Sequence, residues 1–290
     1  MPTFFWNFIG KSGVRFIVGT CSLLLLTGFC VALSGCHAVS AQTAGPHRAK
    51  TPTQSNSIPV IHVVVALCDN KYQGIVPVPA KIGNGDVPEE NLYWGCDLGV
   101  KTYFHHSSNW KLEKTIKHPS KFVMERLVFT NRSHKAIIVA DAYRGREIKS
   151  ATEDFLAFAS GSKPETIEFQ KQRLTIGGGA DFVVYVGHDG LMNFTVANKI
   201  GKAGIQPKKV AILCCKSKEF FGPAMKVANA NPILWTKSLM APEAYVVEAA
   251  VQSFLRKESG NIATDRAAKA YAKYHKISMR AGRTVFTSRF

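Results

Sequence analysis

A histidine and two adjacent cysteines follow apolar segments in the second half of the chain. The segment 182–186 (FVVYV) ends two residues before His188, and the segment 210–213 (VAIL) ends directly before Cys214 and Cys215. A cysteine thiolate is a nucleophile, and a nearby histidine can generate it by taking the thiol proton. His188 and Cys215 are separated by about one crossover unit between parallel strands. A parallel sheet would therefore bring them to one edge as a candidate nucleophilic pair.

The turn after the histidine adds groups that such a pair needs. The backbone N–H groups of Asp189 and Gly190 can stabilise the oxyanion that forms when a thiolate attacks a carbonyl. The pattern leaves open which of Cys214 and Cys215 is the nucleophile. It also permits a purely structural interpretation, because cysteines at strand ends are commonly small core residues.

Unbroken β-branched runs without alternating polar residues predict strands that are buried on both faces of a parallel sheet. The strongest run is 58–67 (IPVIHVVVAL), which we predict to be the first and central strand and which is followed by Cys68 and Asp69. A second run, 135–140 (KAIIVA), is followed by Asp141. Both acidic residues are thus predicted at strand ends, where turn formers are also common.

Helical patterns alternate with these strands. Ser150 begins a capping box for a helix over 150–159, and the apolar spacing within 241–256 predicts a strong amphipathic helix. An alanine-rich helix is expected over 261–275. This alternation predicts an α/β fold, a three-layer α/β/α sandwich with a mostly parallel sheet.

The N-terminus has the features of an export signal. Basic residues precede an apolar stretch, 16–33, which leads into Leu-Ser-Gly-Cys ending at Cys36. This resembles a bacterial lipoprotein box, in which the cysteine is lipidated, and the histidine after it implies sorting to the outer membrane. Cleavage after Ala41, giving a periplasmic or secreted protein, and an uncleaved membrane anchor are the alternatives. All of them place the rest of the chain outside the cytoplasm.

Four parts are predicted from these patterns. Residues 1–36 are predicted to be a lipoprotein signal peptide with its lipobox, and 37–57, which contain no large apolar side chain, a flexible tether. Residues 58–275 would form the α/β domain, and the basic residues 276–290 a solvated, disordered tail.

The chain is strongly basic. It has 37 basic and 20 acidic residues, a formal net charge of +17. Removal of residues 1–35 takes away two basic residues and leaves about +15. Such a surface attracts anionic partners, including lipid headgroups. No basic and aromatic motif for nucleic acid is visible, so we predict no nucleic-acid partner.

Export implies an oxidising compartment, in which thiols can pair. Beyond the lipobox, Cys68 can pair with Cys96 or with Cys214, whereas a bridge between the vicinal Cys214 and Cys215 would be strained. His188 and the acidic residues have the atom types of metal ligands but no diagnostic spacing. We therefore predict no metal and no other cofactor.

The two central segments resemble the caspase–legumain–gingipain clan of cysteine peptidases. In that clan an apolar strand ends in His-Gly and another ends in Ala-Cys, and the counterparts here are VVYVGHDG and VAILCCKS. The letters CKS at 215–217 match the Cys-x-Ser turn of the legumain type, while an Asp stands between the His and the Gly. The resemblance extends over residues 58–258.

This resemblance implies a caspase-like fold in which His188 is the general base and Cys215 the nucleophile. The residues that begin with Trp235 would line the pocket for the side chain before the scissile bond. Two acidic residues would favour a basic side chain in that pocket: Asp69 and Asp141.

We therefore expect a cell-envelope lipoprotein with a cysteine peptidase domain that acts on a peptide or protein substrate. The alternative is a non-enzymatic envelope lipoprotein, with an inactive caspase-like or other α/β domain, that binds a ligand or a protein partner. The aromatic residues Tyr93 and Trp94 would then wall a pocket, unless they cap the core. No Gly-x-Ser-x-Gly motif supports a serine hydrolase.

Overall fold

The structure is a computed structural model that describes residues 58–290 except 132, 134, 197–199 and 201–205. The chain divides after Gln54, and all described residues belong to the compact unit Ser55–Phe290. The predicted signal peptide, Cys36 and the tether lie outside the described residues. No helix in the described part is long and apolar enough to span a membrane.

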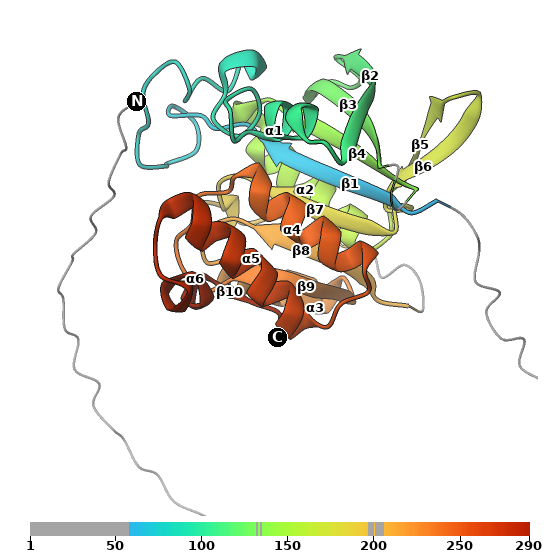
Figure 1. The fold of residues 1–290 in the computed structure, drawn as a ribbon. Helices are drawn as coiled ribbons and strands as arrows, with labels where there is room; N and C mark the ends of the chain where they lie inside the picture. The colour runs from blue at the N-terminus through green and yellow to red at the C-terminus, as the bar shows by residue number, and fades with distance from the viewer. Residues whose placement is uncertain (1–57, 132, 134, 197–199, 201–205) are drawn as a thin grey trace, which may run out of the picture. The chain divides into compact units, whose positions relative to one another are not determined.

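A large sheet runs through the domain (Figure 1). Its strands are β1 (Val60–Ala66), β2 (Trp110–Lys117), β3 (Val123–Asn131), β4 (Ala136–Tyr143), β7 (Phe182–Val186), β8 (Lys208–Leu213), β9 (Ala230–Thr236) and β10 (Phe286–Thr287). Their spatial order is β10-β9-β8-β7-β1-β4-β3-β2. The strands from β9 to β4 in that order run parallel, and β2, β3 and β10 pair antiparallel. The predicted α/β fold with a mostly parallel sheet is thus confirmed.

The first strand is central, as predicted, because β1 lies between β7 and β4. All seven of its residues are buried, which explains the unbroken apolar run. Across the sheet Val65 lies beside Val186, and Val186 lies beside Leu213. The segments after β7 and β8 therefore leave the sheet at the same edge and at nearly the same level.

Helices and a separate hairpin surround the sheet (Figure 1). The helices are α1 (Val100–His106), α2 (Ile148–Ala159), α3 (Ser217–Val227), α4 (Ala244–Leu255), α5 (Gly260–His275) and α6 (Met279–Val285). The described residues also form three short 3-10 helices, η1 (Pro88–Glu90), η2 (Gly145–Glu147) and η3 (Gly190–Met192). β5 (Pro164–Phe169) and β6 (Gln172–Gly177) form a two-stranded sheet of their own.

The side chains of the sheet divide between two hydrophobic clusters, as the alternation of a strand requires. Ile61, Val63 and Val65 of β1 join a cluster with residues of α1, α4 and α5. Val60 and Val64 join a second cluster with residues of α2 and α3. Each group of helices thus covers its own part of the apolar surface, and the sheet positions the turns at the ends of its strands.

Two expectations about element ends were wrong. The strand expected to end at residue 140 continues to Tyr143, so Asp141 lies inside β4 rather than at its end. The helix expected at Ser150 begins at Ile148, and no side chain caps it. Ion pairing explains the first case, because the buried Asp141 finds a cationic partner on the neighbouring strand β3.

The C-terminal residues are structured, in contrast to the predicted disordered tail. They form α6 and then β10, which pairs antiparallel with β9 through Thr236 and Trp235. Phe286 is buried in the core, and the Trp235 indole N–H donates to the carbonyl of Arg289 at 3.0 Å. The buried side chains of Val285 and Phe286, the indole bond and the pairing with β9 hold the segment, and none of these contacts produces a periodic sequence pattern.

Candidate active site at the carboxyl edge of the parallel strands

A three-residue turn joins β8 to α3 and carries Cys215 at its centre. Lys216 adopts a left-handed conformation, with φ of +48°, and its N–H donates to the carbonyl of Ser238 at 3.0 Å. The Ser217 hydroxyl donates to the carbonyl of Ile212 at 2.8 Å. These bonds turn the chain sharply from strand to helix and fix Cys215 beyond the end of β8.

The Cys215 thiol is half-buried and, among the described residues, its hydrogen bonds are to the backbone of Met240. The N–H of Met240 donates to Sγ at 3.4 Å, and Sγ lies 3.5 Å from the Met240 carbonyl oxygen. Burial raises the pKa of the thiol, the Met240 N–H lowers it, and the Asp189 carboxylate raises it. The thiol is consequently protonated at neutral pH.

The neighbouring Cys214 has a different environment. Its side chain is 0% exposed and belongs to the cluster beneath α2 and α3. Burial holds its pKa well above the ordinary thiol value, and the Asp189 carboxylate acts in the same direction. Of the two cysteines, Cys215 is therefore the one that a substrate can reach.

His188 stands after the tightly packed Gly187. That glycine has φ of +144°, and a Cβ there would lie 2.8 Å from the carbonyl oxygen of Ala66. The His188 Nε2 is 2.6 Å from the Oδ1 of Asn193. An amide oxygen can only accept, so Nε2 carries the proton and the lone pair is on Nδ1. Burial lowers the pKa of His188, although the Asn193 bond raises it, so the ring is neutral at pH 7.

Asn193 is a site residue that the sequence pattern did not predict. It comes directly after η3, and its N–H donates to the carbonyl of Gly190 at 2.9 Å. The turn folds the chain back so that the side chain at position 193 reaches the ring at position 188. The sequence signal for this contact is a side-chain amide five residues after a histidine, with a glycine turn between them.

Asp189 has a buried side chain that stabilises this turn. Its Oδ1 accepts the N–H of Leu191 at 3.0 Å. Its Oδ2 is buried and has no hydrogen-bond partner among the described residues. Burial raises its pKa to about 7. The backbone N–H groups of Asp189 and Gly190 donate to no other residue in the described part, as an oxyanion site requires.

The structure brings His188 and Cys215 to one edge but does not join them. Each side chain has its own partner, Asn193 for the imidazole and Met240 for the thiol. Within the described residues no hydrogen bond links the two. The arrangement offers a neutral base and a neutral thiol at the ends of adjacent parallel strands.

Of the three residues expected to bind substrate, Asp69 follows β1 at the same edge of the sheet as His188, whereas Asp141 lies inside β4 and Trp235 inside β9. Asp69 accepts the N–H groups of Lys71 and Tyr72 through Oδ1, which makes it a turn former. Asp141 and Trp235 are both 0% exposed. In the described structure no hydrogen bond or ion pair links any of the three to His188 or Cys215.

The aromatic loop caps the core. Tyr93 and Trp94 are buried in the same cluster as α4, and the Trp94 indole donates to Glu125 at 2.6 Å. Burial raises the pKa of Tyr93 well above its ordinary value, and the thiols of Cys68 and Cys215 act in the same direction.

The thiols of the described domain are all free. No disulfide joins them in this part of the chain, so neither expected pairing of Cys68 is present. The free thiols are those of Cys68, Cys96, Cys214 and Cys215. No group of three or more metal-binding side chains is found among the described residues.

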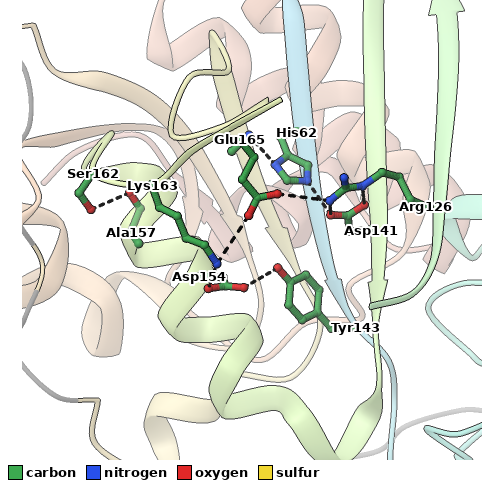
Figure 2. Close-up of polar contacts among 10 residues, drawn as sticks. His62, Arg126, Asp141, Tyr143, Asp154, Ala157, Ser162, Lys163 and Glu165 are labelled. Atoms are coloured by element: carbon green, nitrogen blue, oxygen red, sulfur yellow. Dashed lines mark hydrogen bonds and ion pairs between the residues drawn. The ribbon is translucent and has the colours of Figure 1, made fainter. Parts of the chain in front are cut away.

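A second polar cluster lies inside the domain, around His62 of β1 (Figure 2). The N–H of Gly177 donates to His62 Nδ1 at 3.0 Å, so the proton is on Nε2, which donates to Asp141 at 3.0 Å. Arg126 forms a bidentate ion pair with the same carboxylate, with both contacts at 2.6 Å. In the sequence His62 is a single polar residue within an apolar run, and that pattern alone does not predict the cluster.

This cluster continues toward the surface through Glu165, Lys163 and Asp154 (Figure 2). Because His62 and Asp141 are fully buried and paired, the cluster holds strands together and is not presented to a substrate.

Comparison of the chain with family models, with curated proteins and with solved structures found no match.

Proposed function

We propose that the domain is a caspase-like cysteine hydrolase in which Cys215 is the nucleophile and His188 the general base. The observation that carries the proposal is the parallel pairing of β7 with β8, whose register sends both residues to one edge of the sheet. The central position of β1 and the two helix-covered clusters support the finer assignment, a three-layer caspase-like sandwich.

Both reacting groups begin uncharged at neutral pH. Burial raises the pKa of Cys215 and lowers that of His188. The neutral imidazole is the form that accepts a proton, and Asn193 leaves its Nδ1 free to do so. No preformed ion pair is needed, because proton transfer can accompany attack on a bound carbonyl, and such contacts often tighten only with substrate present.

Acylation can then proceed from these positions. The Sγ proton moves to Nδ1 of His188 while Sγ bonds to the carbonyl carbon and the carbonyl electron pair moves to oxygen. The backbone N–H groups of Asp189 and Gly190 receive the oxyanion. The imidazolium gives its proton to the leaving nitrogen as the C–N bond breaks, and a thioester remains on Cys215.

Hydrolysis reverses the roles. The neutral His188 takes a proton from water, the hydroxyl oxygen bonds to the thioester carbon, and the C–S bond breaks. The proton returns to Sγ, and the carboxylic acid leaves. In the whole protein, we propose that lipidated Cys36 and the tether at 37–57 hold this domain at the outer membrane.

Alkylation of the purified Ser55–Phe290 unit tests the pair. Iodoacetamide at pH 7 should modify Cys215, and His188→Ala should slow that reaction at least tenfold because the base is removed. The matched control is His105→Ala, an exposed histidine on α1. Cleavage of a mixed peptide library should be lost in Cys215→Ser. Equal alkylation rates in all three proteins, with no cleavage, would refute the hydrolase.

A second candidate is a non-catalytic domain that binds a peptide or protein partner. It is favoured by the raised pKa of Cys215 and by the separate partners of the two side chains. Under this alternative the turns after β7 and β8 form a binding edge, and His188→Ala would leave thiol reactivity unchanged while weakening capture of a partner.

A further inference from the structure

The C-terminal part of the domain concentrates positive charge. Residues 260–290 include seven basic residues and one acidic residue. The structure orders them as α5 and α6, so the charges are held on a rigid surface.

Four of these cations lie on α5, directly after it, or on α6. Lys269 and Lys273 are four residues apart and so lie on one side of α5, and Lys276 follows the last residue of that helix as its left-handed C-cap. Arg280 lies in the first turn of α6. All four are exposed, and we call them the basic face.

Nearby acidic groups do not neutralise the basic face. Asp265 pairs with Arg283 at 2.8 Å, and Glu258 pairs with Arg266. In the described part of the chain no ion pair includes a member of the basic face. Its charge is therefore open to a partner outside the domain.

Exposed apolar side chains adjoin the same surface. Ile262, seven residues before Lys269 and so on the same side of α5, is 51% exposed. Ile277, directly after Lys276, is 40% exposed. The opposite side of α5 is packed into the core through Ala267, Ala268 and Tyr271 and is not available.

We propose that the basic face docks on an anionic lipid bilayer, with Ile262 and Ile277 entering the boundary between headgroups and acyl chains. Cations beside exposed aliphatic side chains suit such a surface, where the charges meet lipid headgroups and the isoleucines leave water. Isoleucine offers neither stacking nor hydrogen bonds to a nucleic acid, so these residues favour lipid over a soluble polyanion. The inference is independent of the chemistry at Cys215.

Vesicle co-sedimentation of the Ser55–Phe290 unit tests the proposal, because this unit contains both hydrophobic clusters and lacks the apolar N-terminal segment. The vesicles contain phosphatidylglycerol and phosphatidylcholine in equal parts. The test variant is Lys269→Gln/Lys273→Gln/Lys276→Gln. The control is Lys149→Gln/Lys171→Gln/Lys226→Gln, which removes the same charge from exposed positions on α2, the β5–β6 turn and α3.

Each lysine near an anionic surface contributes to the free energy of binding. The loss of three should therefore lower the partition coefficient of the test variant roughly 100-fold. The control should lose less than tenfold, because only the long-range attraction changes. Binding should also disappear in pure phosphatidylcholine. Equal losses in the two triple variants would overturn the proposal, since total charge rather than this surface would then govern binding. Thermal melts show whether each variant is folded. If the test variant does not fold, the single variant Lys273→Gln takes its place.

Ile262→Ser/Ile277→Ser separates lipid from other polyanions. This variant should bind vesicles several-fold more weakly and inorganic polyphosphate as tightly as the unchanged domain does. Unchanged vesicle binding would overturn the entry of the isoleucines into the bilayer, because charge alone would then account for the binding.

Discussion

Asp189 shows how one buried group can set the charge of its surroundings. Its side chain is 0% exposed, one oxygen caps η3, and the other has no partner in the described structure. Burial raises its pKa to about 7, and its charge in turn raises the pKa of Cys214 and Cys215. The Asp189 carboxyl therefore binds a proton near neutral pH, and its charge acts directly on the pKa of the candidate nucleophile, Cys215.

The stability of the domain should depend on this proton. A folded-state pKa of about 7, above the unfolded value of 3.8, means that Asp189 favours folding at low pH and that this contribution is lost as pH rises toward 7. The loss between pH 5 and pH 8 is roughly 3 kcal/mol. Asp189→Asn removes the titration, so urea unfolding of the variant should lack this fall. Asp97→Asn, at an exposed position, is the control, and an identical fall in Asp189→Asn would contradict the assignment.

At the scale of elements, the Asp141 cluster joins strands that are distant in sequence. Its carboxylate on β4 pairs with Arg126 on β3 and with His62 on β1, and His62 also binds the end of β6 through Gly177 (Figure 2). The negative charge is stable there because the cation and the imidazole N–H offset the burial, and the pKa of Asp141 is lowered. The network therefore fixes the order of strands on this side of the sheet.

Loss of the buried carboxylate should be costly. Asp141→Asn leaves the Arg126 guanidinium buried without a counter-charge, and we expect a loss of about 3–5 kcal/mol in unfolding free energy. Asp154→Asn makes the same change at the more exposed end of the network, beside Lys163, and should cost about 1 kcal/mol or less. Urea unfolding at pH 7 measures both. Adding Arg126→Met to Asp141→Asn should recover stability, and a further loss in the double variant would contradict the pairing.

The elements also show which parts of the fold the sequence predicts. Strands buried on both faces have a local signature, and β1, β7 and β8 and the residues directly after them were predicted from it. The partners of His62 were not, because its contacts with Asp141 and Gly177 join positions 79 and 115 residues apart. β2 was also missed, since it is a largely exposed edge strand that needs only one apolar side.

Over the whole molecule, positive charge is in excess. Residues 1–57 hold four of the 37 basic residues and none of the 20 acidic ones, so the domain from residue 58 has a formal net charge of +13. Many of its ion pairs involve exposed side chains, such as Lys81 with Glu90, and contribute little to stability. Repulsion among the unpaired cations opposes the compact state, and salt screens it over about 10 Å at 0.1 M.

Added salt should therefore stabilise the Ser55–Phe290 unit. Between 20 and 300 mM sodium chloride the thermal midpoint should rise by a few degrees, which corresponds to about 1 kcal/mol for a domain of this size. Both triple lysine variants, at Lys269, Lys273 and Lys276 and at the three control positions, should respond less, and equally, because repulsion depends on the total charge. This equality contrasts with vesicle binding, where the position of the lysines decides the result. A midpoint that falls with salt would show instead that attraction within exposed ion pairs, such as Lys117 with Glu89, outweighs the repulsion.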